Sequence, residues 1–247
     1  MNRWLFDLGN SRLKCARLHD DGRLGEVIAL AHDEKVFVET LREALPGRAD
    51  SACLASVASP ALTAAVVDAL TARFRRISLA RSSTQLAGVR IAYEEPARLG
   101  VDRFLALLAA HARGNQPWLI VGVGTALTID LLDAEGLHRG GRIGPSPRIM
   151  REALHHAAAQ LPAQGGSYRE FATDTADALA SGCEGAALGL IERSLGQAGQ
   201  LLGQPPTLLL HGGGADALAP HLPPALHAPS LVLEGLALWS RPGTGSR

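Results

Sequence analysis

The chain has 247 residues, of which 47% are hydrophobic and 19% are charged, so it is long enough to bury one large core or two smaller ones. Its 24 basic and 24 acidic side chains give a formal net charge of zero, which argues against a nucleic-acid partner and favours a small molecule. Three scattered cysteines without metal-ligand spacing suit reduced thiols. No apolar run has the length of a signal peptide or a membrane span, so we expect a cytoplasmic protein without a membrane partner.

The first half of the chain has the pattern of a short antiparallel meander followed by alternating strands and helices. Strands are expected at residues 3–8, 13–18, 27–31, 52–57 and 76–79, and helices at 34–45, 59–74 and 104–112. A glycine-containing turn at residues 9–11 joins the first two strands. This order predicts a mixed sheet with helices packed on it.

The second half repeats this order of strands and helices, but its amino-acid sequence does not repeat that of the first half. Strands are expected at residues 118–121, 127–132, 137–143 and 208–210, with a turn at 122–125 and helices at 147–159 and 175–202. An apolar run at 231–233 precedes a closing helix, and the tail after Pro242 is expected to be disordered. We therefore predict an α/β protein of two similar lobes, residues 1–116 and 117–247, joined at the polar segment 114–117.

The first turn carries the donors and the acid that a phosphate site uses. Asp7 ends the first strand, Gly9-Asn10-Ser11 forms the turn, and Lys14 follows in the next strand. Backbone N–H groups of a glycine turn can point at phosphate oxygens, while a carboxylate can hold Mg²⁺ through water. The alternative is an ordinary strand-end turn with a solvated lysine.

A second such turn opens the second half of the chain. Gly124-Thr125-Ala126 follows an apolar strand, and Thr128 and Asp130 alternate with apolar residues in the strand after it. Small residues let the backbone approach an anion closely, and the Thr125 hydroxyl adds a donor. A plain hairpin in which glycine only satisfies a positive φ is the alternative.

An acid and an arginine lie side by side at the start of the helix predicted after residue 100. Asp102 is suited to remove a proton from a substrate hydroxyl, and Arg103 to hold a carboxylate, although an aspartate there can also be a simple helix cap. Tyr93 is a candidate wall for the same pocket, or ordinary packing at a strand end.

Two histidine-containing segments carry less information. The adjacent pair His155-His156 does not face one direction on a helix, which argues against a metal site. His211-Gly212-Gly213-Gly214 follows a strand, and it either lets an adenine ring lie against backbone or simply needs glycine geometry.

Together these motifs resemble the type III pantothenate kinase family, of the actin-like, sugar kinase and Hsp70 superfamily. The resemblance covers the chain from Trp4 to about Gly235, and it rests on the order of its motifs more than on any one of them. The motifs are Asp7-x-Gly9-Asn10-Ser11-x-x-Lys14, Gly100-Val101-Asp102-Arg103, Gly124-Thr125-Ala126-x-Thr128-x-Asp130 and Gly140-Gly141-x-Ile143-x-Pro145, with Leu161-Pro162, Asp174-Thr175 and Gly182.

This resemblance implies two actin-like, ribonuclease H-like lobes with a cleft between them, and ATP-dependent phosphorylation of pantothenate in coenzyme A synthesis. It implies Asp102 as the general base and Asp7 as the residue that serves Mg²⁺. It further implies phosphate binding by Gly9, Asn10, Ser11, Lys14, Gly124, Thr125 and Ala126, and pantothenate binding by Tyr93, Gly100, Val101, Arg103 and Thr175. Thr175 would come from the neighbouring subunit of a homodimer, which also binds a monovalent cation, K⁺ or NH₄⁺.

The chain departs from the family pattern at Gly122, where family members commonly carry an aspartate two residues before the glycine of the second turn. The loss of this carboxylate affects either the monovalent-cation site or the support of the turn. The segment Gly144-Pro145-Ser146-Pro147 also differs from the usual proline-glycine pair.

Two other functions remain open from the sequence. Another small-molecule kinase of the same superfamily would share both phosphate turns but differ at residues 100–103. A non-catalytic accessory factor for transcription is the second, because family members have carried that label. The neutral charge and the retained acids argue against it.

Overall fold

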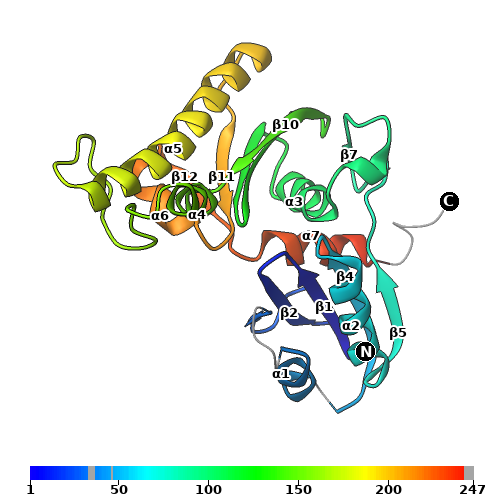
Figure 1. Ribbon diagram of the computed structural model, residues 1–247. Helices are drawn as coiled ribbons and strands as arrows, with labels where there is room; N and C mark the ends of the chain where they lie inside the picture. Colours follow the sequence, from blue (N-terminus) through cyan, green and yellow to red (C-terminus); the bar gives the residue numbers. More distant parts are fainter. Residues whose placement is uncertain (33–36, 46, 242–247) are drawn as a thin grey trace. The chain divides into compact units, whose positions relative to one another are not determined.

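The computed structural model describes residues 1–32, 37–45 and 47–241. The chain forms two compact units (Figure 1). The first comprises Met1–Gly114, Glu135–His138 and the chain from Ser230 onward, and the second comprises Asn115–Ala134 and Arg139–Pro229. The chain thus first passes between units at the polar segment after Gly114, while its closing helix belongs to the first unit.

The first unit contains a five-stranded mixed sheet in the order β3-β2-β1-β4-β5. Its strands are β1 (Arg3–Leu8), β2 (Arg12–Leu18), β3 (Ile28–Ala31), β4 (Ala49–Ser56) and β5 (Phe74–Leu79). The first three are antiparallel neighbours, whereas β4 and β5 continue the sheet in parallel. Parallel neighbours need crossover connections, which the helices supply.

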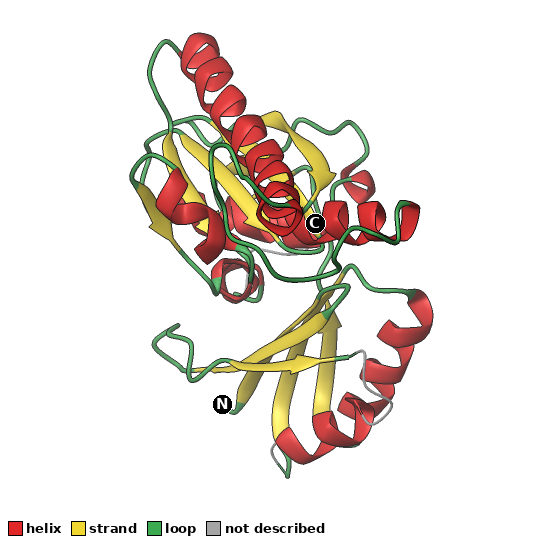
Figure 2. Cartoon of the chain, turned by 60° about the vertical axis from the view of Figure 1, so that its left-hand side comes forward, coloured by secondary structure: helices red, strands yellow, loops and turns green. Residues whose placement is uncertain are grey.

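Helices α1 (Phe37–Ala44) and α2 (Pro60–Thr71) pack on one face of this sheet (Figure 2). There they form a core with Phe6, Leu8 and Leu54. Side chains alternate along a strand, so Leu5 and Asp7 lie on the opposite face, where α7 (Leu231–Trp239) contacts β1 and β2. The alternation therefore places Asp7 on the same face as α7.

The second unit repeats this topology in a sheet of order β10-β9-β8-β11-β12. Its strands are β8 (Trp118–Val123), β9 (Ala126–Leu132), β10 (His138–Pro145), β11 (Thr207–His211) and β12 (Ala225–His227). As in the first unit, the opening pair is antiparallel and the last two strands are added in parallel. The predicted duplication of architecture is confirmed.

Long helices flank the second sheet. Helix α5 (Thr175–Leu202) covers one face through Ala187, Leu188 and Ile191 and packs against α4 (Pro147–Ala157). A short helix, α6 (Ala215–Leu218), buries Leu218 in the same core. Helix α5 begins at an N-cap, Asp174, whose carboxylate accepts hydrogen bonds from two backbone N–H groups, and it ends at Gly203, whose φ of 71° is typical of a helix end.

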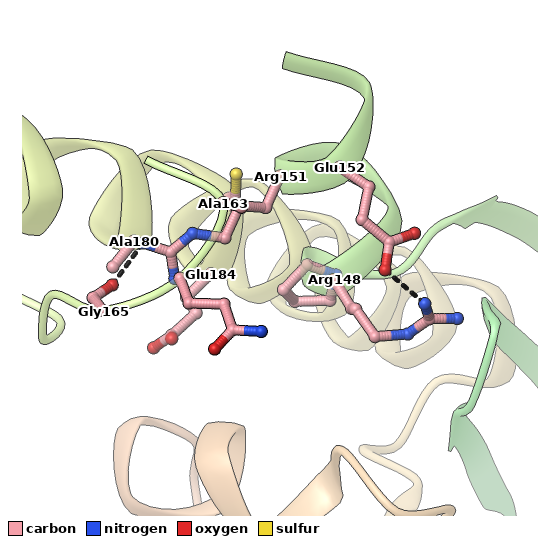
Figure 3. Close-up of a pocket in the computed structure, with 10 residues that line it drawn as sticks. Arg148, Arg151, Glu152, Ala163, Gly165, Ala180 and Glu184 are labelled. Carbon is pink, nitrogen blue, oxygen red and sulfur yellow. Dashed lines mark hydrogen bonds and ion pairs between the residues drawn. The ribbon is translucent and has the colours of Figure 1, made fainter. Parts of the chain in front are cut away.

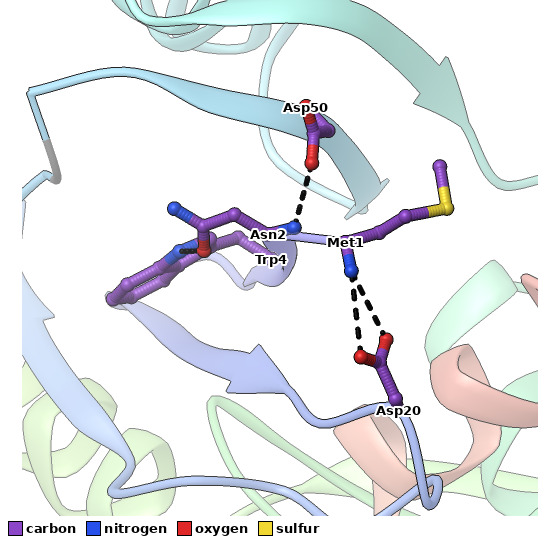
Figure 4. Close-up of polar contacts among 5 residues, drawn as sticks. All are labelled: Met1, Asn2, Trp4, Asp20 and Asp50. Atoms are coloured by element: carbon purple, nitrogen blue, oxygen red, sulfur yellow. Dashed lines mark hydrogen bonds and ion pairs between the residues drawn. The ribbon is translucent and has the colours of Figure 1, made fainter.

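The start of β1 is tied to its neighbours by polar contacts (Figure 4). The backbone N–H of Asn2 donates to the Asp50 carboxylate at 2.7 Å, and the Trp4 indole donates to the Asn2 side chain at 3.1 Å. The Met1 amino group lies 3.3 Å from Asp20, but both groups are exposed, so this ion pair adds little stability. The Asn2–Asp50 bond supports the β1–β4 pairing that positions Asp7.

Most predicted elements are observed with shifted ends, and two predictions are wrong. The helix expected at residues 59–74 ends at Thr71, because Phe74 pairs with Ala49 as the first residue of β5. The run at 231–233 does not precede the closing helix but begins it, as part of α7. A short apolar run has no period that distinguishes a strand from a buried helix. Residues 34–36, Pro46 and the tail after Pro242 lie outside the described residues.

The sequence also did not reveal several short elements. These are the hairpin of β6 (Gln85–Leu86) and β7 (Val89–Arg90), the strand β12, helix α6, and the 3-10 helices η1 (Pro96–Arg98) and η2 (Ala219–His221). Each is too short to show a period. Among the described helices, none has both the length and the apolar character needed to cross a membrane.

Helix α7 packs closely against α3 (Val101–His111), which carries Asp102. At their contact, a Cβ on Gly235 would lie 2.5 Å from the Leu105 carbonyl carbon and closer still to its oxygen. Only a residue without a side chain permits this approach. Arg113, just after α3, also pairs with Glu234 of α7 at 2.5 Å.

We predict that Gly235→Ala destabilises the protein by about 1–3 kcal/mol, because the methyl group overpacks the contact with α3. Urea denaturation would measure this change. Gly189→Ala is the matched control: this helical glycine has open space around its Cβ position, so the variant should be up to about 1 kcal/mol more stable than wild type. Equal stability of both variants would contradict the close packing.

Candidate functional site

Two carboxylates and a lysine come together in the first unit. Asp7 is near the end of β1, and Lys14 lies directly opposite it on β2. Asp102, in the first turn of α3, is close enough that its charge raises the pKa of Asp7. Burial is the larger cause, Lys14 acts in the opposite direction, and the resulting pKa of Asp7 is about 7. The two acids predicted to carry the chemistry therefore share one site.

Local backbone geometry sets the position of the Asp102 carboxylate. Its Oδ1 accepts the backbone N–H of Arg103 at 2.8 Å. Gly100 is the N-cap of α3 and provides no side-chain cap. A Cβ on Gly100 would lie 2.6 Å from Asp102 Oδ1, so the carboxylate occupies space that any other residue at position 100 would fill. This requirement explains the glycine two residues before the acid.

Arg103 is held beside Asp102 by aromatic residues. The residue is only 6% exposed, and its Nη1 donates to the Tyr93 hydroxyl at 3.3 Å. The Tyr93 ring stacks on the buried His138 ring, with centroids 6.0 Å apart and an interplanar angle of 9°. His138 Nδ1 also accepts the Ala92 N–H at 3.5 Å. Sequence reasoning missed His138, because no motif connects the start of β10 with Tyr93.

The first turn is a tight hairpin connection between β1 and β2. The Gly9 N–H donates to the Arg12 carbonyl at 3.0 Å, and the Gly9 carbonyl lies 2.9 Å from His32 Nε2. Asn10 and Ser11 are exposed at its tip. Hydrogen bonds to the Gly9 backbone thus stabilise the turn, while the side chains at its tip are exposed to solvent.

The second turn lies in the second unit and is supported by different residues. The Gly124 N–H donates to the Ala126 carbonyl at 3.0 Å. Ser146 is 1% exposed, caps α4 and donates its hydroxyl to the Thr125 carbonyl at 2.8 Å. The departure noted at residues 144–147 therefore places a serine that ties the turn to a helix.

The predicted residue Thr175 lies in the second unit. It is the exposed first residue of α5. Gly122, at the end of β8, pairs with Thr128 on β9 and with His211 on β11. The remaining predicted residues, Gly100, Val101 and Arg103, lie with Asp102 at the start of α3.

A cavity of about 370 Å³ lies between α4, α5 and the loop that joins them (Figure 3). Its lining carries two arginines and two glutamates. Arg148 pairs with Glu152, and Arg151 donates to the Gly165 carbonyl. None of the predicted site residues lines it. We therefore locate the candidate active site at Asp7 and Asp102 and not in this cavity.

Asp7 and Asp102 suit a divalent cation whose remaining ligands are water and substrate phosphates. In the described part of the chain, no group of three or more His, Cys, Asp or Glu side chains forms a complete metal site. Mg²⁺ usually binds through one or two carboxylates together with water and substrate phosphates. Asp7, opposed by Asp102, has the chemistry for such a ligand, because a cation would relieve the repulsion between the two acids.

The fold and these acids define a class of protein. Two units with the same mixed-sheet topology, each with a glycine turn between its first two strands, are typical of the actin-like and sugar-kinase superfamily. Solved structures agree on the fold. A Sinorhizobium meliloti protein described as a 2-dehydro-3-deoxygalactonokinase has a TM-score of 0.56 at 16% identity, covering 95% of this chain and 97% of its own.

Sequence comparison identifies the family. The family model described as type III pantothenate kinase matches residues 4–197. Curated type III pantothenate kinases from Stenotrophomonas maltophilia K279a and Xanthomonas euvesicatoria are 60% and 57% identical to this chain, each over 97% of it and 98% of their own length. The chain belongs to the type III pantothenate kinase family. Family members are kinases of coenzyme A biosynthesis, and ATP-dependent phosphoryl transfer requires a divalent metal.

A third comparison bears on the transcription alternative. A Campylobacter jejuni protein described as a Baf family transcriptional activator has a TM-score of 0.63 at 20% identity, covering 94% of each chain. At that identity the likeness shows the fold alone. The curated relatives, at much higher identity, do not favour the alternative.

The raised pKa of Asp7 predicts a pH-dependent stability in the metal-free protein. Between pH about 4 and about 7 the folded state keeps the Asp7 proton that the unfolded chain has released. The folded state then binds more protons, so the free energy of unfolding falls as pH rises through this window. Asp7→Asn should remove this contribution, on the order of 2 kcal/mol for a half-buried acid.

Urea denaturation at pH 5 and pH 8 measures this effect. The wild type should lose more stability between the two pH values than Asp7→Asn does. The exposed residue Asp68, whose side chain is 77% accessible, supplies the control Asp68→Asn, which should retain the wild-type pH dependence. An unchanged pH dependence in Asp7→Asn would contradict the raised pKa.

Proposed function

We propose that the chain transfers the γ-phosphoryl group of ATP to the primary alcohol of pantothenate and so produces 4′-phosphopantothenate, the first step of coenzyme A biosynthesis. The family assignment supports the substrate. The observation that carries the mechanism is the shared site of Asp7 and Asp102, with Lys14 opposite the first acid and Arg103 beside the second.

Asp102 acts as the general base. It accepts the proton of the pantothenate hydroxyl as that oxygen forms a bond to the γ-phosphorus and the bond to the leaving ADP oxygen breaks. Its carboxylate is held by the Arg103 N–H and lies over Gly100. A base fixed in this way loses little orientational freedom when substrate binds.

The two turns and Asp7 bind the nucleotide. Gly9, Asn10, Ser11 and Lys14 at the first turn, and Gly124, Thr125 and Ala126 at the second, provide donors to ATP phosphate oxygens. Asp7 would hold Mg²⁺, which neutralises charge on the β- and γ-phosphates when it is bound.

Arg103, Tyr93, Gly100 and Val101 bind pantothenate. The buried guanidinium pairs with the pantothenate carboxylate, since a desolvated arginine binds a carboxylate strongly. Thr175 completes the pocket from the second copy of a homodimer, a role that its exposed position at the start of α5 permits. The monovalent cation of the family, K⁺ or NH₄⁺, depends on the position occupied here by Gly122.

We predict that Asp102→Asn lowers kcat by at least about 100-fold, because the amide cannot accept the hydroxyl proton. A coupled assay for ADP release, with and without pantothenate, measures this loss. Binding of MgATP by calorimetry should remain near wild type. Asp68→Asn, on the surface of α2, should have wild-type kcat. Turnover within a few-fold of wild type in Asp102→Asn would remove this residue from its role.

The same assay distinguishes pantothenate from other acceptors. A sugar kinase of the superfamily would release ADP with a hexose and not with pantothenate. A non-catalytic protein would release ADP with neither.

We predict that His138→Ala raises the KM for pantothenate about three- to tenfold, because Tyr93 loses its stacking partner and no longer orients Arg103. The kcat and the KM for ATP should stay close to wild type. His138→Phe retains an aromatic ring and should restore most of the pantothenate affinity. Equal changes in both KM values would indicate a general loss of structure instead.

A further inference from the structure

The space beside Gly122 is already filled. A Cβ added to this residue would lie 2.6 Å from Thr128 Oγ1 and 2.7 Å from His211 Nε2. Real Cβ atoms do not approach other atoms so closely, so a side chain at position 122 requires the imidazole and the hydroxyl to move. In this chain an imidazole takes the place in which an aspartate side chain would begin.

His211 is held in that place by the backbone around it. It ends β11, in register with Gly122 on β8. Gly212 follows with a φ of 92°, and a Cβ there would lie 2.5 Å from the Val123 carbonyl oxygen. The Gly214 N–H donates to the same oxygen at 3.0 Å. The segment after His211 is therefore locked onto the end of the strand that leads into the second phosphate turn.

This arrangement does not fit the monovalent cation that the family resemblance implies. K⁺ is bound by oxygen ligands, and a carboxylate provides both oxygen and negative charge. Gly122 provides no side chain, and the neighbouring groups are a nitrogen heterocycle and one neutral hydroxyl, that of Thr128. The family carboxylate is thus absent, and the space for it is occupied.

We propose that His211 supports the second phosphate turn in place of that carboxylate, and that turnover by this chain is independent of K⁺ and NH₄⁺. His211 is a positioning residue: its Nε2 lies beside Gly122, near the end of the strand that enters the turn. This inference rests on the proposed kinase function, because it concerns the turn assigned to ATP phosphates.

The first test is pantothenate-dependent ADP release in the chlorides of K⁺, NH₄⁺, Na⁺ and choline at one ionic strength. We expect kcat/KM for ATP to agree within about twofold across the four salts. A tenfold or larger stimulation by K⁺ or NH₄⁺ would overturn the inference and leave the proposed function standing. Absence of pantothenate-dependent ADP release in all four salts would contradict the proposed function instead.

A second readout does not depend on turnover. A specifically bound cation stabilises the folded state and raises Tm. With and without MgADP, we expect the Tm of the protein to be the same in KCl, NaCl and choline chloride within about 1 °C. A rise specific to KCl would show a potassium site and contradict the inference even in an inactive preparation.

Substitutions test whether His211 is the group that fills the space. Gly122→Ala should destabilise the wild-type protein but be tolerated better in a His211→Gly background, which is a non-additive result. The same destabilisation in both backgrounds would contradict the role of His211. In the double variant Gly122→Asp with His211→Gly, the family carboxylate has room, and we expect stimulation by K⁺ to appear in the ADP assay.

His211→Ala separates support of the turn from substrate binding. It should raise the KM for ATP about three- to tenfold while leaving the KM for pantothenate near wild type, since only the second turn loses a packing partner. His211→Gln retains a polar side chain of similar reach and should recover part of the ATP affinity. A wild-type KM for ATP in His211→Ala would remove His211 from this role.

Discussion

The close approach of two carboxylates is the constraint on which the active site depends. Asp7 and Asp102 come from elements almost a hundred residues apart, and the charge of Asp102 opposes ionisation of Asp7. Their separation is set by helix packing, because α7 contacts both β1 and α3 and approaches α3 at a glycine. A site that is electrostatically strained without a cation is well suited to bind nucleotide and metal together, since the metal relieves the repulsion.

Burial also shapes the part of the site proposed to bind pantothenate. Arg103 is almost fully removed from solvent and is oriented by the Tyr93 hydroxyl, and the Tyr93 ring rests on His138. A desolvated guanidinium binds a carboxylate strongly, which suits a carboxylate-bearing substrate. The proposed base and the proposed substrate anchor are adjacent residues on one helix turn, so in this proposal the reacting hydroxyl and the anchored end of the substrate are positioned together.

The two units share a topology but support their glycine turns by different means. His32 contacts the first turn, whereas Ser146 holds the second and His211 fills the space beside it. Because both sheets have the same strand order, the glycine turn lies at the same position in each, between the first two strands of the unit. The supporting side chains come from later segments and are free to differ. This freedom explains how a residue such as Gly122 can replace a family acid without loss of the fold.

The sequence alone determined the alternation of strands and helices, both glycine turns and the position of Asp102 at a helix start, because these features follow from local period and turn chemistry. Only the tertiary structure decided that Phe74 begins a strand, that residues 231–233 are helical and that α7 returns to the first unit. It alone also placed His138 under Tyr93 and His211 beside Gly122. These contacts join segments far apart in the chain, and pairing and packing at such separations leave no local pattern in the residues that make them.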